Sequence, residues 1–316
     1  MHNNPVLAHK LQVLDPYLGM KANELCINNI GEICIDKGDS WEYIKDERLT
    51  IQFLDDFLTQ LATRRGQRFN QKYCHLSCEL PLPYARYRVQ AQHKSSLFNS
   101  EVSICIRIPN KDKFDLENFI LSQRVKNAKW DYEKIRALIR EKKNVLISGG
   151  TGSGKTSFLN SLMGEISAEA RVVTIEDSQE LDLSHIKNKV QLAVPKEENE
   201  IYGYQQAINN AMRLRPDRLF LGEIDIRNTF TFLRVNNTGH AGNLSTLHAN
   251  NPHDAIKAII TNVIIGGSLQ NPDKTMLMEL IITAIDYIIQ ITREGKTRIV
   301  SDILNLKEFY TRTNKK

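Results

Sequence analysis

The segment "NVLISGGTGSGKTSFL", residues 144–159, joins an apolar run, a glycine-rich turn and a lysine in immediate succession. It matches the phosphate-binding pattern G-x-x-x-x-G-K-[ST], with a β-forming run before the turn and an amphipathic run after it. In such a turn, backbone N–H groups converge on phosphate oxygens, and the following helix N-terminus adds partial positive charge. The segment therefore predicts an α/β domain that binds a nucleoside triphosphate.

The residues of this loop have separate expected tasks. Lys155 is expected to reach the β- and γ-phosphates of ATP, and the Thr156 hydroxyl is expected to ligate Mg²⁺. ATP and Mg²⁺ are therefore the expected cofactors. The residues expected to contact the nucleotide here are Gly150, Thr151, Gly152, Ser153, Gly154, Lys155, Thr156 and Ser157.

Acidic residues follow two later apolar runs. "LFLGEI" (219–224) places Glu223 at a strand end, where a carboxylate can polarise the attacking water. A glycine precedes it, and glycine cannot hold a metal, so another acid should help. Glu176 and Asp177, which end "VVTIED" (172–177), are the expected suppliers, because ligand groups in open α/β sheets collect at the carboxyl ends of strands.

Two histidines bracket the next strand. "TGHAGNLSTLHAN" (238–250) places His240 on a glycine-rich loop and His248 at a strand end. An imidazole there can hydrogen-bond the γ-phosphate or Glu223. Both histidines are therefore expected in the catalytic site as sensors of the γ-phosphate.

The patterns divide the chain into two domains. Residues 1–108 predict a smaller α+β domain, with strands at 32–36, 84–92 and 101–108 and a helix at 49–66. Residues 129–316 alternate helices and strands, as an α/β domain does. The charged stretch 109–128 is expected to be the linker between them.

Composition is that of an ordinary globular protein. The 316 residues are 41% hydrophobic and 25% charged, with a net charge of +5 that permits acidic partners without requiring them. No stretch predicts a membrane span or a secretory signal. Five cysteines fit a reducing compartment better than a disulfide framework. Cys74, His75 and Cys78 lack the further ligands that a structural zinc site needs.

Four motifs occur in order: "GGTGSGKT", "TIEDSQEL", "MRLRPDRLFLGE" and "GHAGNLSTLHAN". Together they resemble the traffic ATPases of bacterial type IV secretion systems, members of the secretion ATPase superfamily. The resemblance implies a RecA-like P-loop ATPase domain, a homohexameric ring and ATP hydrolysis that powers assembly or transfer of protein or DNA. It also implies a cytoplasmic location at the inner membrane, with the other components of a secretion machine as partners and peripheral membrane contact.

The same resemblance gives residues their expected roles. Lys155 and Thr156 would be the Walker A residues, and Glu223 the Walker B glutamate. The Asp box and His box would contribute Glu176, Asp177, His240 and His248. In the first domain, Arg88 and Arg107 would approach the γ-phosphate, where a guanidinium stabilises transition-state charge.

Alternatives remain open, and one of them, a nucleotide-gated scaffold, rests on a departure from the family pattern. The family usually has arginine two residues after the Walker B glutamate, and this chain has Asp225 there, with Arg227 as the nearest arginine. A type II secretion or pilus motor, a nucleic-acid translocase and a nucleotide-gated scaffold with little turnover remain alternatives. Direct nucleic-acid binding is not expected, because basic residues are scattered instead of lining one surface.

Overall fold

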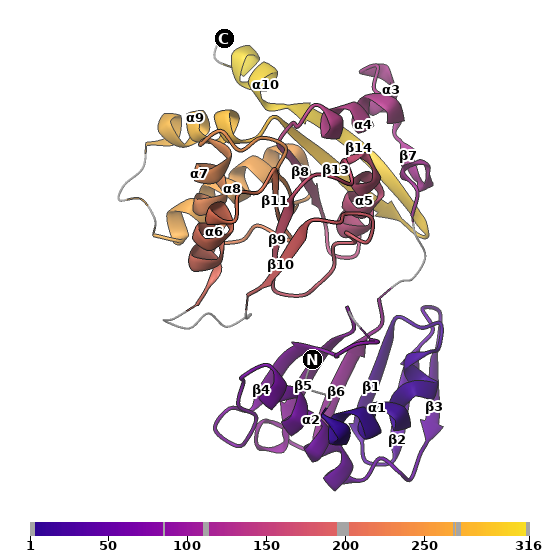
Figure 1. The fold of residues 1–316 in the computed structure, drawn as a ribbon. Helices are drawn as coiled ribbons and strands as arrows, with labels where there is room; N and C mark the ends of the chain where they lie inside the picture. Colours follow the sequence, from indigo (N-terminus) through magenta and orange to yellow (C-terminus); the bar gives the residue numbers. More distant parts are fainter. Residues whose placement is uncertain are drawn as a thin grey trace. The chain divides into compact units, whose positions relative to one another are not determined.

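The computed structural model describes residues 4–84, 86–109, 114–194, 202–267, 269 and 273–313. The chain forms two compact units, Met1–Asp112 and Lys113–Lys316, each with its own sheet (Figure 1). We call them the N-terminal unit and the C-terminal unit. Among the described residues, no helix is long and apolar enough to cross a membrane.

The N-terminal unit is an antiparallel sheet that packs against α-helices. In its described part the strand order is β3-β2-β1-β6-β5-β4. The elements are α1 (Pro5–Leu18), β1 (Glu24–Asn29), β2 (Glu32–Asp36), β3 (Trp41–Lys45), α2 (Ile51–Arg64), β4 (His75–Glu79), β5 (Arg88–His93), η1 (Lys94–Ser96) and β6 (Val102–Arg107).

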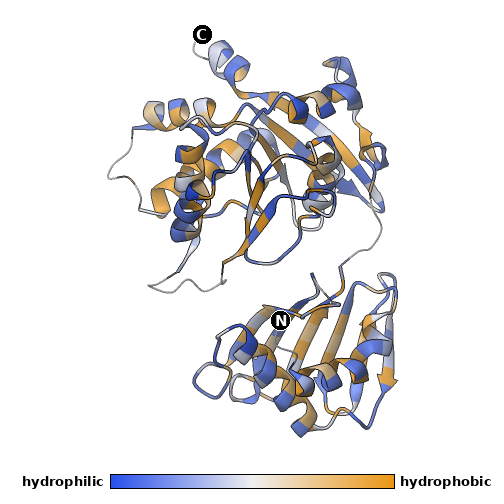
Figure 2. Ribbon diagram, in the orientation of Figure 1, coloured by the Kyte–Doolittle hydropathy of each residue, from blue (hydrophilic) through white to orange (hydrophobic). Residues whose placement is uncertain are grey.

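Alternation along these strands gives the sheet one apolar face. Leu25 and Ile27 of β1 are fully buried with Leu54 and Leu58 of α2, whereas Cys26 between them is half-buried. Because successive side chains of a strand point to opposite faces, the second face carries the polar and thiol side chains. Hydrophobic residues accordingly concentrate in the strands and on one side of the helices (Figure 2).

The C-terminal unit is a mostly parallel sheet. The order in its described part is β10-β9-β11-β12-β8-β13-β14-β7, with β13 and β14 antiparallel. The elements are η2 (Leu116–Asn118), β7 (Phe119–Leu121), α3 (Gln123–Asn127), α4 (Tyr132–Arg140), β8 (Val145–Gly149), α5 (Lys155–Leu162), η3 (Met163–Glu165), β9 (Val172–Glu176), β10 (Lys189–Ala193), α6 (Tyr204–Arg213), β11 (Arg218–Leu221), α7 (Thr229–Asn236), β12 (Leu244–His248), α8 (Pro252–Ile265), α9 (Lys274–Ala284), β13 (Tyr287–Glu294), β14 (Thr297–Asn305) and α10 (Leu306–Thr313).

An apolar core packs against each of the two faces of this sheet. One core contains residues of α4 and α5, and the other contains residues of α6 to α10 (Figure 1). Strand β8 supplies both, because Leu146 lies in one core and Val145 and Ile147 lie in the other. The strands are therefore apolar on both faces, which is typical of parallel sheets covered by helices.

The region predicted as a linker, residues 109–128, differs from that prediction over much of its length. Residues 116–127 form η2, β7 and α3, and β7 pairs with β14 in the C-terminal sheet. Leu116, Phe119 and Val125 are buried in the core beside α5. These spaced apolar side chains outweigh the high local charge, so this part of the region belongs to the C-terminal unit.

Candidate active site

Most of the predicted site residues of the C-terminal unit come from the carboxyl ends of neighbouring strands, whereas His240 precedes the amino end of β12 (Leu244–His248) and so differs from the predicted role beside the γ-phosphate. Strands β9, β11, β12 and β8 lie next to one another and run parallel. Glu176 ends β9, Glu223 follows β11 by two residues, His248 ends β12, and the glycine-rich loop follows β8. The topology therefore collects residues that are up to about a hundred positions apart at one edge of the sheet.

The loop after β8 has the backbone that its glycines allow. Gly154 has φ +99°, a left-handed conformation that other residues rarely adopt. A Cβ atom on Gly149 would lie 2.5 Å from the carbonyl oxygen of Ile291, so only glycine fits there. The predicted loop residues Gly150, Thr151, Gly152, Ser153 and Gly154 connect β8 to α5, and Lys155, Thr156 and Ser157 form the first turn of α5.

Lys155 and His248 contact each other inside this site. The buried Lys155 Nζ lies 3.2 Å from His248 Nδ1, and it donates hydrogen bonds to the carbonyl oxygens of Gly149 and Gly150. His248 Nε2 lies 2.8 Å from Glu223 Oε1. A neutral His248 protonated on Nε2 satisfies both contacts, because Nδ1 then accepts from Lys155 and Nε2–H donates to Glu223.

The pKa values of Glu223, Lys155 and His248 are all shifted toward the uncharged form of each group. Burial raises the pKa of Glu223 to about 7, and the negative charges of Glu180, Asp177 and Asp225 act in the same direction while Lys155 opposes them. Burial lowers the pKa of Lys155, and burial with the Lys155 charge lowers the pKa of His248. A carboxylate with a pKa near neutrality suits a general base.

The acid that contacts Thr156 is Glu180, which the sequence reading did not single out. The Thr156 hydroxyl donates to Glu180 Oε2 at 2.9 Å, and Asn160 Nδ2 donates to the Glu180 carbonyl oxygen at 3.0 Å. The pattern "TIEDSQEL" contains this acid, but only folding of the loop after β9 brings it to α5. Glu180 is therefore a further candidate beside Mg²⁺.

Glu176, by contrast, is turned into the protein. Its Oε1 accepts the backbone N–H groups of Glu180 and Leu181, both at 2.9 Å, and Thr174 Oγ1 donates to its Oε2. Burial raises its pKa to about 7. These contacts differ from the predicted role of a metal ligand, because the carboxylate of Glu176 holds the backbone of the loop after β9.

The Glu176 side chain also explains why position 222 is a glycine. A Cβ atom at position 222 would lie 3.1 Å from Glu176 Cγ. An aspartate at position 222 would therefore crowd Glu176, and the glycine leaves room for that side chain. The backbone of Glu223 is then held by Asn228 Nδ2, which donates to its carbonyl oxygen at 3.0 Å.

His240 and Asp225 have local contacts. The carbonyl oxygen of His240 accepts from Asn243 Nδ2 at 2.9 Å, and its ring Nδ1 has no hydrogen-bond partner among the described residues. Asp225 Oδ2 accepts from Arg227 Nε at 2.8 Å, and the Arg227 guanidinium lies 4.9 Å from the ring centroid of Tyr204. Asp225 thus shapes the turn before α7 and pairs with the nearest arginine.

Arg88 and Arg107 belong to the N-terminal unit, where the sheet brings them together. They are directly opposed on the antiparallel strands β5 and β6 and therefore share a face. Within the described chain, neither guanidinium has an ion pair with a carboxylate. Neighbouring Glu79, opposite Arg88, is paired with Arg65 instead. The two arginines therefore bring two positive charges to the same part of the sheet.

The loop residues fit a nucleoside triphosphate with Mg²⁺. Lys155 supplies a buried ammonium group, and the buried Ser153 hydroxyl has no hydrogen-bond partner within the described part of the chain. The Thr156 hydroxyl and the Glu180 carboxylate provide hard oxygen donors, which Mg²⁺ prefers. A second residue missed by the sequence reading is Arg298, whose side chain lies close beside Gly154.

The chain is similar to known proteins over most of its length. Residues 83–298 match the family model described as Type II/IV secretion system protein. The VirB11 protein of Bartonella henselae is 28% identical, with 87% of this chain and 86% of that protein covered. PtlH of Bordetella pertussis is 28% identical, with 93% of each chain covered. Both relatives are named as type IV secretion system proteins.

Solved structures share the fold. The VirB11 ATPase of Brucella suis aligns with a TM-score of 0.52 at 22% identity, covering 99% of this chain and 98% of that chain. The pilus retraction motor PilT aligns with a TM-score of 0.71 at 18% identity, covering 97% and 89%. The predicted α/β fold, a RecA-like ATPase domain after a smaller N-terminal domain, is confirmed, as is the resemblance to type IV secretion traffic ATPases. The chain belongs to the Type II/IV secretion system protein family.

Proposed function

We propose that this protein is an ATP-hydrolysing motor of a type IV secretion system. It acts as a homohexamer at the cytoplasmic side of the bacterial inner membrane, with inner-membrane and cytoplasmic components of the machine as partners. ATP binding and hydrolysis drive movement between its two units, and that movement powers apparatus assembly or transfer of protein or DNA. The observation that carries the proposal is the contact series Lys155, His248 and Glu223 beside the glycine-rich loop.

Different residues of the site bind phosphate, hold Mg²⁺ and accept the proton. Lys155 and the loop N–H groups bind phosphate oxygens, and the Thr156 hydroxyl with Glu180 would hold Mg²⁺, which supplies charge neutralisation at the phosphates. Glu223 accepts a proton from the attacking water. His248 orients Glu223 through Nε2–H and links it to Lys155. Through this link, a change at the phosphate reaches the general base.

Arg88 and Arg107 are proposed to stabilise the charge of the γ-phosphate in the transition state. The support is their pairing across β5 and β6, together with the implied role of arginines in the related motors. Two guanidinium groups near the γ-phosphate stabilise it most when negative charge accumulates on it in the transition state. Their contribution is therefore to the rate of hydrolysis more than to the affinity for ATP.

Phosphate release by the purified full-length protein tests the proposal. Glu223→Gln should lower the hydrolysis rate by about a hundredfold or more while keeping ATP affinity, because the amide cannot accept the proton. Lys155→Ala should weaken ATP binding itself. The matched control is Glu169→Gln, which removes an exposed carboxylate whose ion pair with Lys187 lies on the surface.

Wild-type hydrolysis in Glu223→Gln would contradict the assignment of the base. Rates at background level in the wild-type protein would favour the nucleotide-gated scaffold. Stimulation by single-stranded DNA with strand unwinding would favour a nucleic-acid translocase, whereas stimulation by lipid with association of secretion components would favour the secretion motor.

A further inference from the structure

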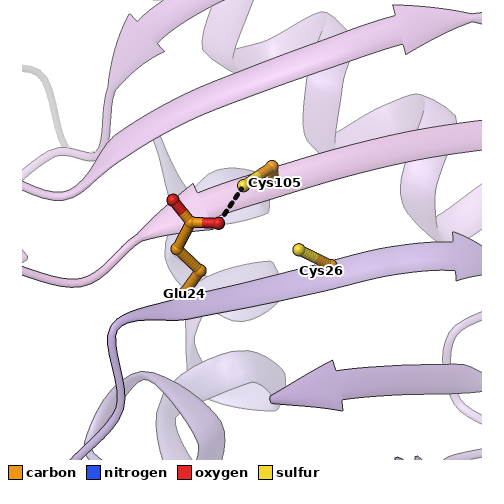
Figure 3. A group of neighbouring side chains, drawn as sticks. All are labelled: Glu24, Cys26 and Cys105. Carbon is orange, nitrogen blue, oxygen red and sulfur yellow. Dashed lines mark hydrogen bonds between the residues drawn. The ribbon is translucent and has the colours of Figure 1, made fainter. Parts of the chain in front are cut away.

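Two cysteines and a glutamate meet on the face of the N-terminal sheet that α1 and α2 do not cover. Cys26 of β1 is directly opposed to Cys105 of β6, and Glu24 precedes Cys26 by two residues on the same strand face. Figure 3 shows the three side chains turned toward one another, with the Cys105 thiol donating to Glu24 Oε2 at 3.5 Å. All three side chains are half-buried.

The three donor atoms are close enough to share one ion. The two sulfur atoms and a carboxylate oxygen all lie within 4.8 Å of one another. Around a tetrahedral zinc ion, with Zn–S near 2.3 Å, such atoms are separated by about 3.5 to 3.8 Å. Rotations of these side chains would close the remaining gaps, which are at most about 1.3 Å.

We propose that Glu24, Cys26 and Cys105 form a binding site for a thiophilic divalent cation, with Zn²⁺ as the reference ion. Two thiolates select zinc or cadmium over magnesium or calcium, which prefer oxygen donors. Three protein ligands leave the fourth tetrahedral position to water or to a partner's side chain. The site lies outside the nucleotide loop and does not depend on the proposed function.

Binding is an exchange of protons for the metal. The thiol protons of Cys26 and Cys105 leave to solvent, each sulfur lone pair forms a bond to the cation, and no electron is transferred. The bound cluster of two thiolates, one carboxylate and a divalent cation keeps one net negative charge. Arg107, directly opposite Glu24, places a cationic side chain beside that charge.

The other cysteines of this unit are differently placed. Strand β2, on the other side of β1 from β6, places Cys34 opposite Cys26. Cys34 is buried, and burial raises the pKa of the Cys34 thiol. Cys78 lies in the apolar core, and half-buried Cys74 is outside the cluster.

Metal titration of the full-length, untagged, nucleotide-free protein in reducing buffer tests the site. Zn²⁺ competition with a chromophoric chelator and Cd²⁺ titration followed by thiolate charge-transfer absorption should both show one high-affinity equivalent per chain. Cys26→Ser, Cys105→Ser and Glu24→Gln should each weaken binding at least about tenfold. Cys74→Ser is the matched control, because it removes a half-buried thiol elsewhere in the unit, and its affinity should equal the wild-type value.

A measurement on the wild-type protein keeps the test independent of variant folding. Zn²⁺ should slow iodoacetamide modification of Cys26 and Cys105, mapped by mass spectrometry, and leave the rate at Cys74 unchanged. The thiolate band excludes binding through His248 and Glu223, which have no sulfur. Absence of the band in the wild-type protein, its persistence in the Cys26→Ser/Cys105→Ser double variant, or equal alkylation rates with and without Zn²⁺ would overturn the proposal.

Discussion

At the scale of single residues, two glutamates of the C-terminal unit have the same raised pKa for different purposes. Glu223 is half-exposed and contacts His248, so its proton can be exchanged with a substrate. Glu176 is almost completely buried, and its oxygens accept backbone N–H groups of the loop after β9. A perturbed pKa therefore identifies a functional residue only when the side chain can be reached.

Glu176→Gln should change how stability depends on pH. The folded-state pKa of about 7 exceeds the ordinary value of 4.5, so the folded protein binds the extra proton between these values and loses stability as pH rises through them. The shift corresponds to a loss of about 3 kcal/mol in the unfolding free energy between pH values below 4.5 and above 7. Urea unfolding at pH 5 and pH 8 should show a smaller loss in Glu176→Gln than in the wild type. Equal losses in both proteins would show that Glu176 is not the titrating group.

Glu180→Gln should raise the Mg²⁺ concentration needed for half-maximal hydrolysis by about tenfold, because an amide is a weaker ligand for this hard cation. The expectation rests on the contact between Glu180 and Thr156. A Mg²⁺ titration of phosphate release measures it, with Glu169→Gln as the surface control. An unchanged requirement would mean that Glu180 only fixes the loop.

At the scale of elements, the short strand β7 shows how a few apolar residues make a charged segment part of the C-terminal sheet. Phe119 is fully buried and meets Phe158 of α5 edge to face, with ring centroids 5.0 Å apart. Ile120, the next residue on the strand, is 51% exposed. The strand thus ties the start of the C-terminal unit to the helix that follows the phosphate-binding loop.

Phe119→Ala should lower the unfolding free energy of the C-terminal unit by about 3 to 5 kcal/mol, since it removes a buried ring and leaves a cavity. Ile120→Ala is the matched control and should change it by less than about 1 kcal/mol, because it points away from the core. Denaturant unfolding measures both values. Equal effects would show that β7 does not contribute its buried face to the core.

At the scale of the whole molecule, the two units have separate hydrophobic cores. The N-terminal core contains residues from Leu7 to Ile108, and the two cores of the C-terminal unit begin at Leu116 and Leu146. Separate cores allow separate unfolding. The two tryptophans of the chain, Trp41 and Trp130, lie one in each unit and can report on each of them.

Leu54→Ala, a substitution in the core of the N-terminal unit, should lower the stability of that unit alone by about 2 to 5 kcal/mol. Single-tryptophan versions made by Trp130→Phe or Trp41→Phe allow urea unfolding of each unit to be followed by fluorescence. The midpoint reported by Trp41 should fall, and that reported by Trp130 should stay. A common shift of both midpoints would mean that the units unfold as one.

The sequence alone determined the elements with strong local signals. The strand before the glycine-rich loop, the helix after it and the helix predicted at 49–66, which spans Ile51–Arg64 in the structure, follow from periodicity and turn residues. Short elements without such signals were not predicted, among them β10 and α7, because their stability comes from neighbours distant in the chain. The motifs also predicted Lys155, Glu223 and His248 as site residues, and the structure brings these three into contact.

Only the tertiary structure decided which acids face the nucleotide loop. Glu176 and Glu180 are both carboxylates in one short motif, and no spacing rule says which one the loop after β9 turns inward. Folding buries Glu176 against backbone N–H groups and brings Glu180 to Thr156. Likewise, Glu24 and Cys26 meet Cys105 only when β1 pairs with β6. Such encounters depend on strand register and loop path, which are set by contacts across the whole unit and not by local sequence.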